Sequence, residues 1–301
     1  MAPEAAPRLA DLATVISVAV VKGGAGKTSL TANIAGILAR AGWRVLVVAI
    51  DPQDNVGEDL GYTHRAESDD GRALVDALLH DAPLRPSLID VRPDLDVICC
   101  GEELSEAIPD MIRADTPATA LADALIPIAD DYDFILIDCP PGYSFLQNLA
   151  LTASSWVLTP SQSDLSSRKG IRYLAKQFAQ ARTDNPDLRL LGVVLFDLPS
   201  TATRVLAETR EFIQVELGDL APVLQTPIRS ASSAAKAARD RGLLMHELVD
   251  VPQAKWWEIR RGEKPASGIP ASAEKVAADY MAVTEEILTI MNSAKEQEQA
   301  R

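Results

Sequence analysis

The chain has 301 residues, of which 47% are hydrophobic and 24% are charged, and its formal net charge is −14 at pH 7. A chain of this length and hydrophobic content can bury a large core, either in one large α/β domain or in two small ones. No run approaches the roughly 18 apolar residues of a membrane span, and residues 1–13 lack the apolar region of a secretory signal, so we expect a cytoplasmic protein.

Apolar β-branched runs alternate with helical patterns along the chain. The runs predict buried strands at residues 14–21, 44–50, 95–100, 133–138, 155–160 and 188–196. Helices are predicted at residues 28–42 and 201–218, and each of them ends on a glycine. Such an alternation is typical of a parallel sheet that is covered on both faces. We therefore predict a doubly wound, mostly parallel α/β fold with helices on both faces.

A single domain is expected over residues 14–292, because no change in composition marks a boundary within it. Residues 1–13 are expected to form a flexible N-terminus and residues 293–301 a polar tail. Residues 251–272 are rich in Pro, Gly and Ser, which indicates an irregular insertion. This insertion suits either a partner or nucleic-acid surface, or a loop held to the body by its tryptophans. Its aromatic and basic residues are Trp256, Trp257, Arg260, Arg261 and Lys264.

The first predicted strand leads directly into the segment KGGAGKTS, residues 22–29, and then into a helix. The glycines allow a tight turn that brings backbone N–H groups to phosphate oxygens at the helix N-terminus. Lys27 would neutralise charge on the β- and γ-phosphates, and the Thr28 hydroxyl would bind Mg²⁺. The expected nucleotide-binding residues of this segment are Gly23, Gly24, Ala25, Gly26, Lys27, Thr28 and Ser29.

Two further carboxylates follow predicted strands, at the edge where α/β sheets bind ligands. Asp138 ends the run DFILID and is the candidate for the Mg²⁺ shell, through a water molecule. Asp51 follows the run VLVVAI and is the candidate that orients the attacking water beside the metal. An aspartate at a strand end can also cap a helix or form a turn, and this alternative stays open for Asp51. We predict Lys27, Asp51 and Asp138 as catalytic residues, and Thr28, Asp51 and Asp138 as the metal-site residues.

The three cysteines are Cys99, Cys100 and Cys139. Their number is odd and their spacing fits no zinc site. The first two follow apolar residues in a predicted strand, so we predict buried thiols.

Acidic residues are concentrated in one part of the chain. Residues 51–138 contain 22 Asp and Glu against 5 Lys and Arg, whereas residues 139–301 contain 19 of each kind. A helix over residues 166–182 would place several basic side chains on one face, which is either an ordinary solvated surface or a contact for DNA phosphates. The candidate DNA-binding residues are Arg168, Arg172, Lys176, Arg204, Arg210, Lys236, Arg239 and Arg241.

The segments KGGAGKTS, IDPQDN and LIDCPPG resemble the deviant Walker A, switch and Walker B motifs of the ParA/MinD group of ATPases. Their order and spacing are similar to those of the ParA branch from about residue 14 to about residue 250. The resemblance implies that ATP and Mg²⁺ are bound. It also implies that Lys22 is a nucleotide-binding and catalytic residue, which reaches across a nucleotide-sandwich homodimer to the phosphates bound by the other subunit. The segment with Pro227 and Arg229 is implied to lie near the adenine.

The same resemblance implies an ATPase for plasmid or chromosome partition. In the cycle of such an ATPase, ATP-bound dimers bind DNA non-specifically and become nucleoid-associated, and a ParB-type centromere-binding partner stimulates hydrolysis. Two residues depart from the family pattern. Ala49 stands where many members have an acid, which predicts slow hydrolysis, and Asp54 stands in place of the usual glycine.

Three alternatives remain open at this point. A MinD-like ATPase would bind membrane through a basic C-terminal helix, but the C-terminal segment from residue 273 has three basic residues against six acids. Cys139 invites comparison with the nitrogenase iron protein group, although no second cysteine ligand is obvious. Ala49 also allows an ATP-gated adaptor with very slow turnover. In the C-terminal segment a helical stripe is predicted to pack on the core: Val276, Tyr280, Val283, Ile287 and Ile290.

Overall fold

The computed structural model describes residues 12–19, 24–63, 65, 67–141, 144–162, 165–199, 203–218, 222–252 and 269–299. Lys22, Gly23 and residues 253–268, which contain both tryptophans of the insertion, lie outside the described residues. The side chains of Arg168 and Arg172 lie outside them as well.

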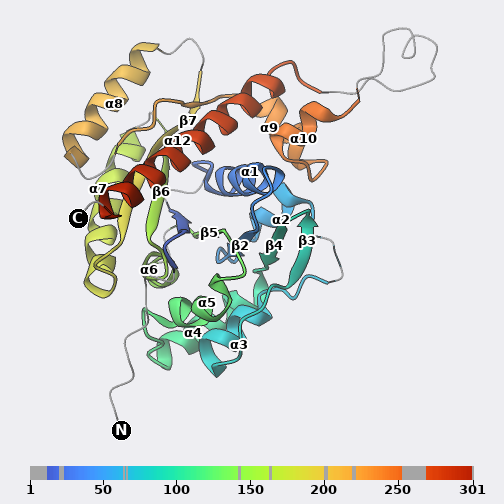
Figure 1. The fold of residues 1–301 in the computed structure, drawn as a ribbon, viewed down its shortest axis with the longest axis vertical. Helices are drawn as coiled ribbons and strands as arrows, with labels where there is room; N and C mark the ends of the chain where they lie inside the picture. The colour runs from blue at the N-terminus through green and yellow to red at the C-terminus, as the bar shows by residue number, and fades with distance from the viewer. Residues whose placement is uncertain are drawn as a thin grey trace.

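A sheet of eight strands runs through the described part of the chain, in the order β3-β4-β2-β5-β1-β6-β7-β8 (Figure 1). Neighbouring strands are parallel except for β3 and β4, which are antiparallel. The strands are β1 (Val15–Val18), β2 (Val45–Ala49), β3 (Leu88–Arg92), β4 (Leu95–Ile98), β5 (Phe134–Asp138), β6 (Trp156–Ser161), β7 (Arg189–Leu198) and β8 (Ile228–Arg229). The predicted parallel α/β fold is therefore confirmed.

Each predicted strand coincides with an observed strand, but β3 and β8 have no counterpart among the predicted runs. In β3 the side chain of Ile89 is 61% exposed, and Asp90 has a left-handed backbone with φ of 51°. This edge strand therefore has no continuous apolar run to reveal it. β8 has only two residues, which is too short for any periodic pattern.

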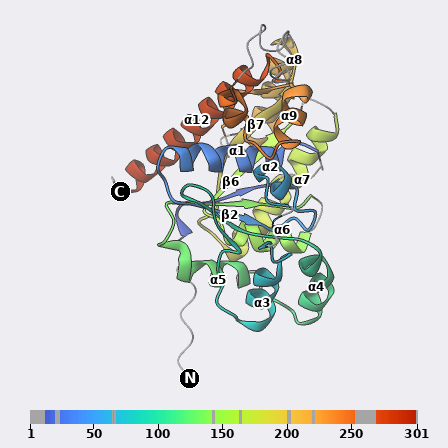
Figure 2. The same ribbon diagram turned by 90° about the vertical axis from the view of Figure 1, so that its right-hand side faces the viewer.

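Helices cover both faces of the sheet. α1, α10 and α12 pack together on one face, whereas α3, α4, α5 and α6 lie on the other (Figure 1 and Figure 2). Observed α1 and α8 confirm the two predicted helices, and α7 covers the basic segment. The described helices are α1 (Lys27–Arg40), α2 (Asn55–Leu60), α3 (Arg72–His80), α4 (Glu102–Arg113), α5 (Ala120–Ala129), α6 (Ser144–Thr152), α7 (Leu165–Asp184), α8 (Thr203–Leu217), α9 (Ser232–Arg239), α10 (Met245–Asp250) and α12 (Ala273–Gln299).

The central strands are buried throughout, which agrees with their continuous apolar runs. Cys99, Cys100 and Cys139 are buried free thiols, as predicted. Burial raises the pKa of the Cys99 and Cys139 thiols to about 12. Because the thiolate is the reactive form, these cysteines are inert at neutral pH.

The C-terminal helix α12 packs its predicted apolar stripe on the core. Val276, Tyr280, Val283 and Ile287 are buried, and Ile290 is partly buried against the core. The helix continues to Gln299, through most of the segment that we expected to be a polar tail. None of the helices in the described part of the chain is long and apolar enough to cross a membrane.

The strand register brings the candidate site together. Asp138 of β5 is level with Val18 of β1 and with Ala49 of β2. The three strands are parallel, so the segments that follow them meet at one edge of the sheet. These segments are the glycine-rich loop before α1 and the loop that contains Asp51.

Candidate functional site

The glycine-rich loop turns into α1 with a left-handed backbone at Gly24 and Gly26, whose φ angles are 79° and 84°. A Cβ atom at Gly26 would overlap the ring of Phe196 on β7. Both the backbone conformation and this contact require glycine there. Immediately after the turn, Lys27 and Thr28 are buried, so the start of α1 presents a cation and a hydroxyl inside the site.

Lys27 faces Asp51 across the edge of the sheet. The Lys27 Nζ atom lies 3.6 Å from the Asp51 Oδ2 atom, and both side chains are buried. The other carboxylate oxygen of Asp51 accepts the Gln53 N–H at 3.2 Å. Asp51 is thus fixed beside the lysine that is expected to bind phosphate.

Asp138 lies on the hydroxyl side of the same site. The Thr28 hydroxyl donates to Asp138 Oδ2 at 2.9 Å, and the Thr31 hydroxyl lies 3.5 Å from Oδ1. Burial raises the pKa of the Asp138 carboxyl to about 6, although Lys27 and the Thr28 hydrogen bond oppose the shift. A bound cation would therefore favour the ionised carboxylate.

The donor set fits Mg²⁺ only with additional oxygen ligands. Among the described residues, no group of three or more His, Cys, Asp or Glu side chains could hold a metal ion alone. Thr28 and Asp138 supply a hydroxyl and a carboxylate, and Mg²⁺ usually completes such a shell with water and substrate phosphates. The residues present fit a metal ion that arrives with a nucleotide.

Asp54, in place of the usual glycine, has a left-handed backbone with φ of 41° and ψ of 40°. The Tyr62 hydroxyl donates to its Oδ1 atom at 2.8 Å, and the Tyr62 side chain is fully buried. Burial raises the pKa of the Asp54 carboxyl to about 7, and the nearby Asp138 charge adds to this effect. Burial therefore favours the protonated form of the Asp54 carboxyl.

Replacing Asp54 with asparagine should stabilise the ligand-free protein relative to the parent, and this stabilisation should increase as the pH rises. The folded pKa of about 7 exceeds the reference value of 3.8, so the stability conferred by the protonated carboxyl is lost as pH rises through about 7. Asparagine stays neutral and can still accept the Tyr62 hydrogen bond.

Urea unfolding at about pH 5.5 and about pH 8 measures this effect as a free-energy difference from the parent. The stabilisation by Asp54→Asn should be larger at the higher pH. Asp81→Asn is the control, since Asp81 is also left-handed but is exposed. Equal effects at both pH values would contradict the raised pKa of Asp54.

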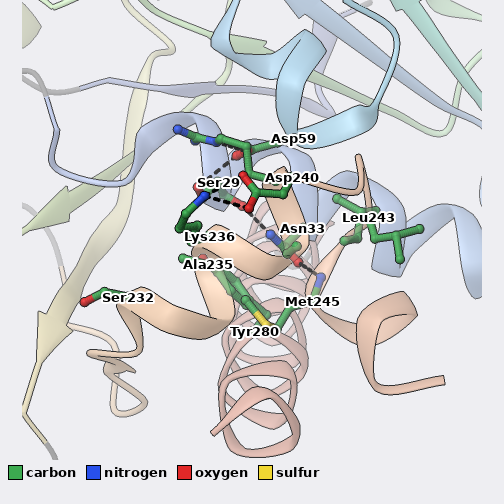
Figure 3. Close-up of a pocket in the computed structure, with 13 residues that line it drawn as sticks. Ser29, Asn33, Asp59, Ser232, Ala235, Lys236, Asp240, Leu243, Met245 and Tyr280 are labelled. Atoms are coloured by element: carbon green, nitrogen blue, oxygen red, sulfur yellow. Dashed lines mark hydrogen bonds and ion pairs between the residues drawn. The ribbon is translucent and has the colours of Figure 1, made fainter. Parts of the chain in front are cut away.

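A pocket of about 480 Å³ lies beside the first two turns of α1 (Figure 3). The Ser29 hydroxyl donates to Asp59 Oδ2 at 2.8 Å, and Arg239 Nε donates to Asp59 Oδ1 at 2.7 Å. Asn33 accepts the Met245 N–H at 2.8 Å, which ties α1 to α10. The pocket walls come from α1, α2, α9 and α12, with Ser29 adjacent to Thr28 of the phosphate loop.

Arg92 fixes the far end of α2. Its Nε and Nη2 atoms each donate to a carboxylate oxygen of Glu247 at 2.8 Å. Its Nη1 atom donates to the Leu60 carbonyl at 2.6 Å, and Nη2 also donates to the Gly242 carbonyl at 2.9 Å. Because Leu60 ends α2, Arg92 holds the helix that follows the Asp51 segment.

Sequence reasoning did not identify Asn33, Asp59 or Arg92, and it gave Arg239 a different role. Ser29 and Asn33 are four residues apart, so they share a face of α1, and this spacing could have indicated a polar helix face toward a pocket. The contacts of Asp59 and Arg92 span large sequence separations and left no local pattern.

The segment expected near the adenine approaches this pocket through α9, which follows Arg229 and lines one wall. Arg229 itself binds Asp279 of α12 through Nε and Nη2, at 2.6 Å each. Pro227 is half-buried, and neither Pro227 nor Arg229 lines the pocket. Their assignment to the nucleotide remains a prediction.

The predicted DNA-binding residues lie on separate elements. Lys176 on α7 and Arg241 are exposed. Arg204 pairs with Glu208 on α8, and Lys236 pairs with Asp240 beside α9. Arg210 and Arg239 bind groups outside their own helices: Arg210 donates to the Leu224 and Gln225 carbonyls, and Arg239 donates to Asp59 of α2. For these two, the internal contacts provide no support for a DNA-binding role.

Comparison with known proteins identifies the family. Residues 13–190 match the family model described as an AAA domain. The chromosome partitioning protein ParA of Myxococcus xanthus is 33% identical over 214 residues, which cover 69% of this chain and 74% of that protein. The chain belongs to the ParA family of partition ATPases. Nucleotide hydrolysis is the general activity that this family membership supports.

Two solved structures extend the comparison. Apo McdA of Cyanothece has a TM-score of 0.71 at 17% identity, over 91% of this chain and 99% of that chain, so the likeness concerns the fold alone. Cobyrinic acid a,c-diamide synthase of Mycobacterium smegmatis, with bound ADP and magnesium, has a TM-score of 0.63 at 26% identity. That match covers 84% of this ParA-family chain and 97% of the synthase.

Proposed function

We propose that the chain is a Mg²⁺-dependent ATPase that acts in plasmid or chromosome partition. One arrangement carries this proposal: Lys27 lies 3.6 Å from Asp51, and Thr28 lies 2.9 Å from Asp138, where three parallel strands end. A buried cation, a hydroxyl and two carboxylates in this arrangement suit phosphoryl transfer to water. The ADP and magnesium in the synthase structure support the choice of ligand.

Each residue has a distinct role in this proposal. The backbone N–H groups of the loop and the Lys27 ammonium bind the β- and γ-phosphates, and the start of α1 adds favourable potential. Thr28 and Asp138 would hold Mg²⁺, with Asp51 beside them as the third metal-site residue. Bound Mg²⁺ would neutralise charge on the transferred phosphate. Asp51 accepts a hydrogen bond from the attacking water and aligns it.

The remaining assignments rest on family membership. Lys22 contacts the phosphates bound by the second subunit of an ATP-dependent homodimer, and thereby makes dimer formation depend on ATP. Pro227 and Arg229 hold the segment that borders the base, and Gly23, Gly24, Ala25, Gly26 and Ser29 complete the phosphate loop.

An ATP-gated adaptor that turns ATP over very slowly is a second candidate function. Ala49 is fully buried in β2 and is level with Asp138, so the position where many family members have an acid contains only a methyl group here. Without a carboxylate at this position, the site offers less negative charge for binding Mg²⁺, which favours slow turnover. Steady-state phosphate release with and without a partner distinguishes the two candidates.

In the proposed cycle, the ATP-bound dimer binds DNA without sequence preference, and a ParB-type partner stimulates hydrolysis and release. The acidic excess of the chain lies in residues 51–138, so the rest of the chain can present basic side chains despite a net charge of −14. Arg168, Arg172 and Lys176 on α7 are the first candidates for phosphate contact.

Changing these three residues to glutamate should reduce ATP-dependent affinity for a random-sequence duplex at least about tenfold. The slope of log affinity against log salt should fall by roughly 0.9 for each DNA phosphate that is no longer neutralised by a basic side chain. Fluorescence anisotropy with a labelled duplex measures both quantities. Lys275→Glu with Lys295→Glu, at two exposed α12 positions, controls for most of the change in net charge, which is −4 in the control and −6 in the triple variant. Unchanged affinity and slope would exclude α7, and no ATP-dependent binding by the parent would exclude the DNA hypothesis.

A further inference from the structure

A second cavity, of about 680 Å³, is lined by residues of α3, α5 and the loops beside them. These two helices lie on the opposite face of the sheet from α1 and α12 (Figure 2). The cavity is bounded by the end of α3, the loop that follows it, and one side of α5. Leu78 and Leu84 are buried in its floor, and Ala124 and Ile128 form a half-buried wall. We call this cavity the α3–α5 groove. Its volume is within the roughly 300–1,000 Å³ of ligand-binding pockets.

Acidic side chains line the edge of the α3–α5 groove. Asp81, Asp123 and Asp131 are exposed at this edge, and Arg85 is the one basic residue among those that line it. Within the described chain, no hydrogen bond or ion pair involves the side chains of these three aspartates. Three carboxylates without partners therefore surround an apolar floor.

The α3–α5 groove therefore combines an apolar floor with three carboxylates, which accept hydrogen bonds, and Arg85 is the one basic side chain among the described residues that line it. Arginine and lysine side chains supply only donors, together with positive charge.

We propose that the α3–α5 groove docks a basic segment of a partner protein, with an apolar side chain on the floor and flanking arginine or lysine side chains on the three aspartates. Charge complementarity favours this occupant over a nucleic acid, which the aspartates would repel, and over the acidic half of a second copy of this chain. The surrounding residues 51–138, with 22 acidic and 5 basic residues, would also speed its association. This proposal is independent of ATP turnover.

The probe is a short fluorescein-labelled peptide that alternates arginine and leucine, titrated with the full chain and followed by anisotropy. The parent should bind it, and added salt should weaken binding. Asp123→Arg replaces attraction by repulsion and should weaken binding about tenfold. Ala124→Leu fills the groove without changing the net charge and should also weaken binding several-fold.

Glu106→Arg is the matched control, because Glu106 is an exposed acid on α4 within the same acidic part of the chain and does not line the groove. It should retain nearly the parent affinity. Thermal unfolding verifies that each variant is folded, and Asp123→Asn replaces Asp123→Arg if that variant is not. The proposal is wrong if the parent does not bind the peptide, or if Ala124→Leu binds like the parent while Glu106→Arg loses as much affinity as Asp123→Arg. It is equally wrong if the groove variants alter self-association, measured by sedimentation without peptide, instead of peptide binding.

Discussion

Replacing Asp51 with alanine should reduce ATP turnover at least about 100-fold while ATP binding persists. The carboxylate is fixed between the Lys27 ammonium and the Gln53 N–H, so its removal takes away the acceptor for the attacking water and leaves the phosphate loop intact. Lys27 also loses a competing anion, which favours phosphate binding. Phosphate release and fluorescent-nucleotide binding measure the two effects separately.

Lys22→Ala is the contrasting variant. It should impair the ATP-dependent dimer, whereas Asp51→Ala should still form the dimer with ATP and Mg²⁺. Sedimentation with ATP and Mg²⁺ decides between these outcomes. If Lys22→Ala dimerises like the parent, its proposed role across the dimer is wrong; if Asp51→Ala fails to bind ATP, Asp51 supports the loop rather than the chemistry.

Replacing Gly242 with alanine should lower the free energy of unfolding by about 3 kcal/mol. Gly242 has φ of 59°, and a Cβ atom there would lie 2.5 Å from the Cα atom of Gly61. Gly61 also has a positive φ, of 70°, and its backbone packs directly against that of Gly242. The added methyl group has no flexible side chain to displace, so the turn after α9 must separate from the end of α2.

Gly218→Ala is the matched control for this effect. Gly218 has a similar φ of 55°, but a Cβ atom there would meet nothing within 4 Å. It should cost only the left-handed strain, about 1 kcal/mol. Urea unfolding of both variants measures the difference, and equal losses would show that the contact between Gly61 and Gly242 contributes nothing. Arg92 joins the Gly242 carbonyl to the Leu60 carbonyl at the end of α2, the helix that follows the Asp51 segment. Gly242→Ala should therefore also weaken nucleotide binding.

The strands and the phosphate loop could be predicted because their signals are local. Six continuous apolar runs in the sequence coincide with strands of the sheet, and the run before the loop ends where the glycines allow a left-handed turn. Parallel strands then bring Asp51 and Asp138 to one edge. The position of each aspartate at the end of a predicted strand was therefore enough to predict that these side chains lie close together.

The network around the site was beyond sequence reasoning because it depends on tertiary packing. Charge alone suggests DNA as the partner of Arg239, but α9 packs against α2 and the guanidinium binds Asp59. The family resemblance implies a position near the nucleotide for Arg229, which stays a prediction, and it does not reveal that Arg229 binds the buried carboxylate of Asp279 on α12. In both cases a partner far away in the sequence determines what the arginine contacts.

The buried thiols have a practical consequence for experiments on this chain. Cys99, Cys100 and Cys139 are the only cysteines in the sequence, and all three are inside the core with raised thiol pKa values. A maleimide dye added to the folded protein should therefore find no native site. One cysteine introduced at exposed Lys176 would carry a fluorophore at a single known position, without first removing the natural cysteines.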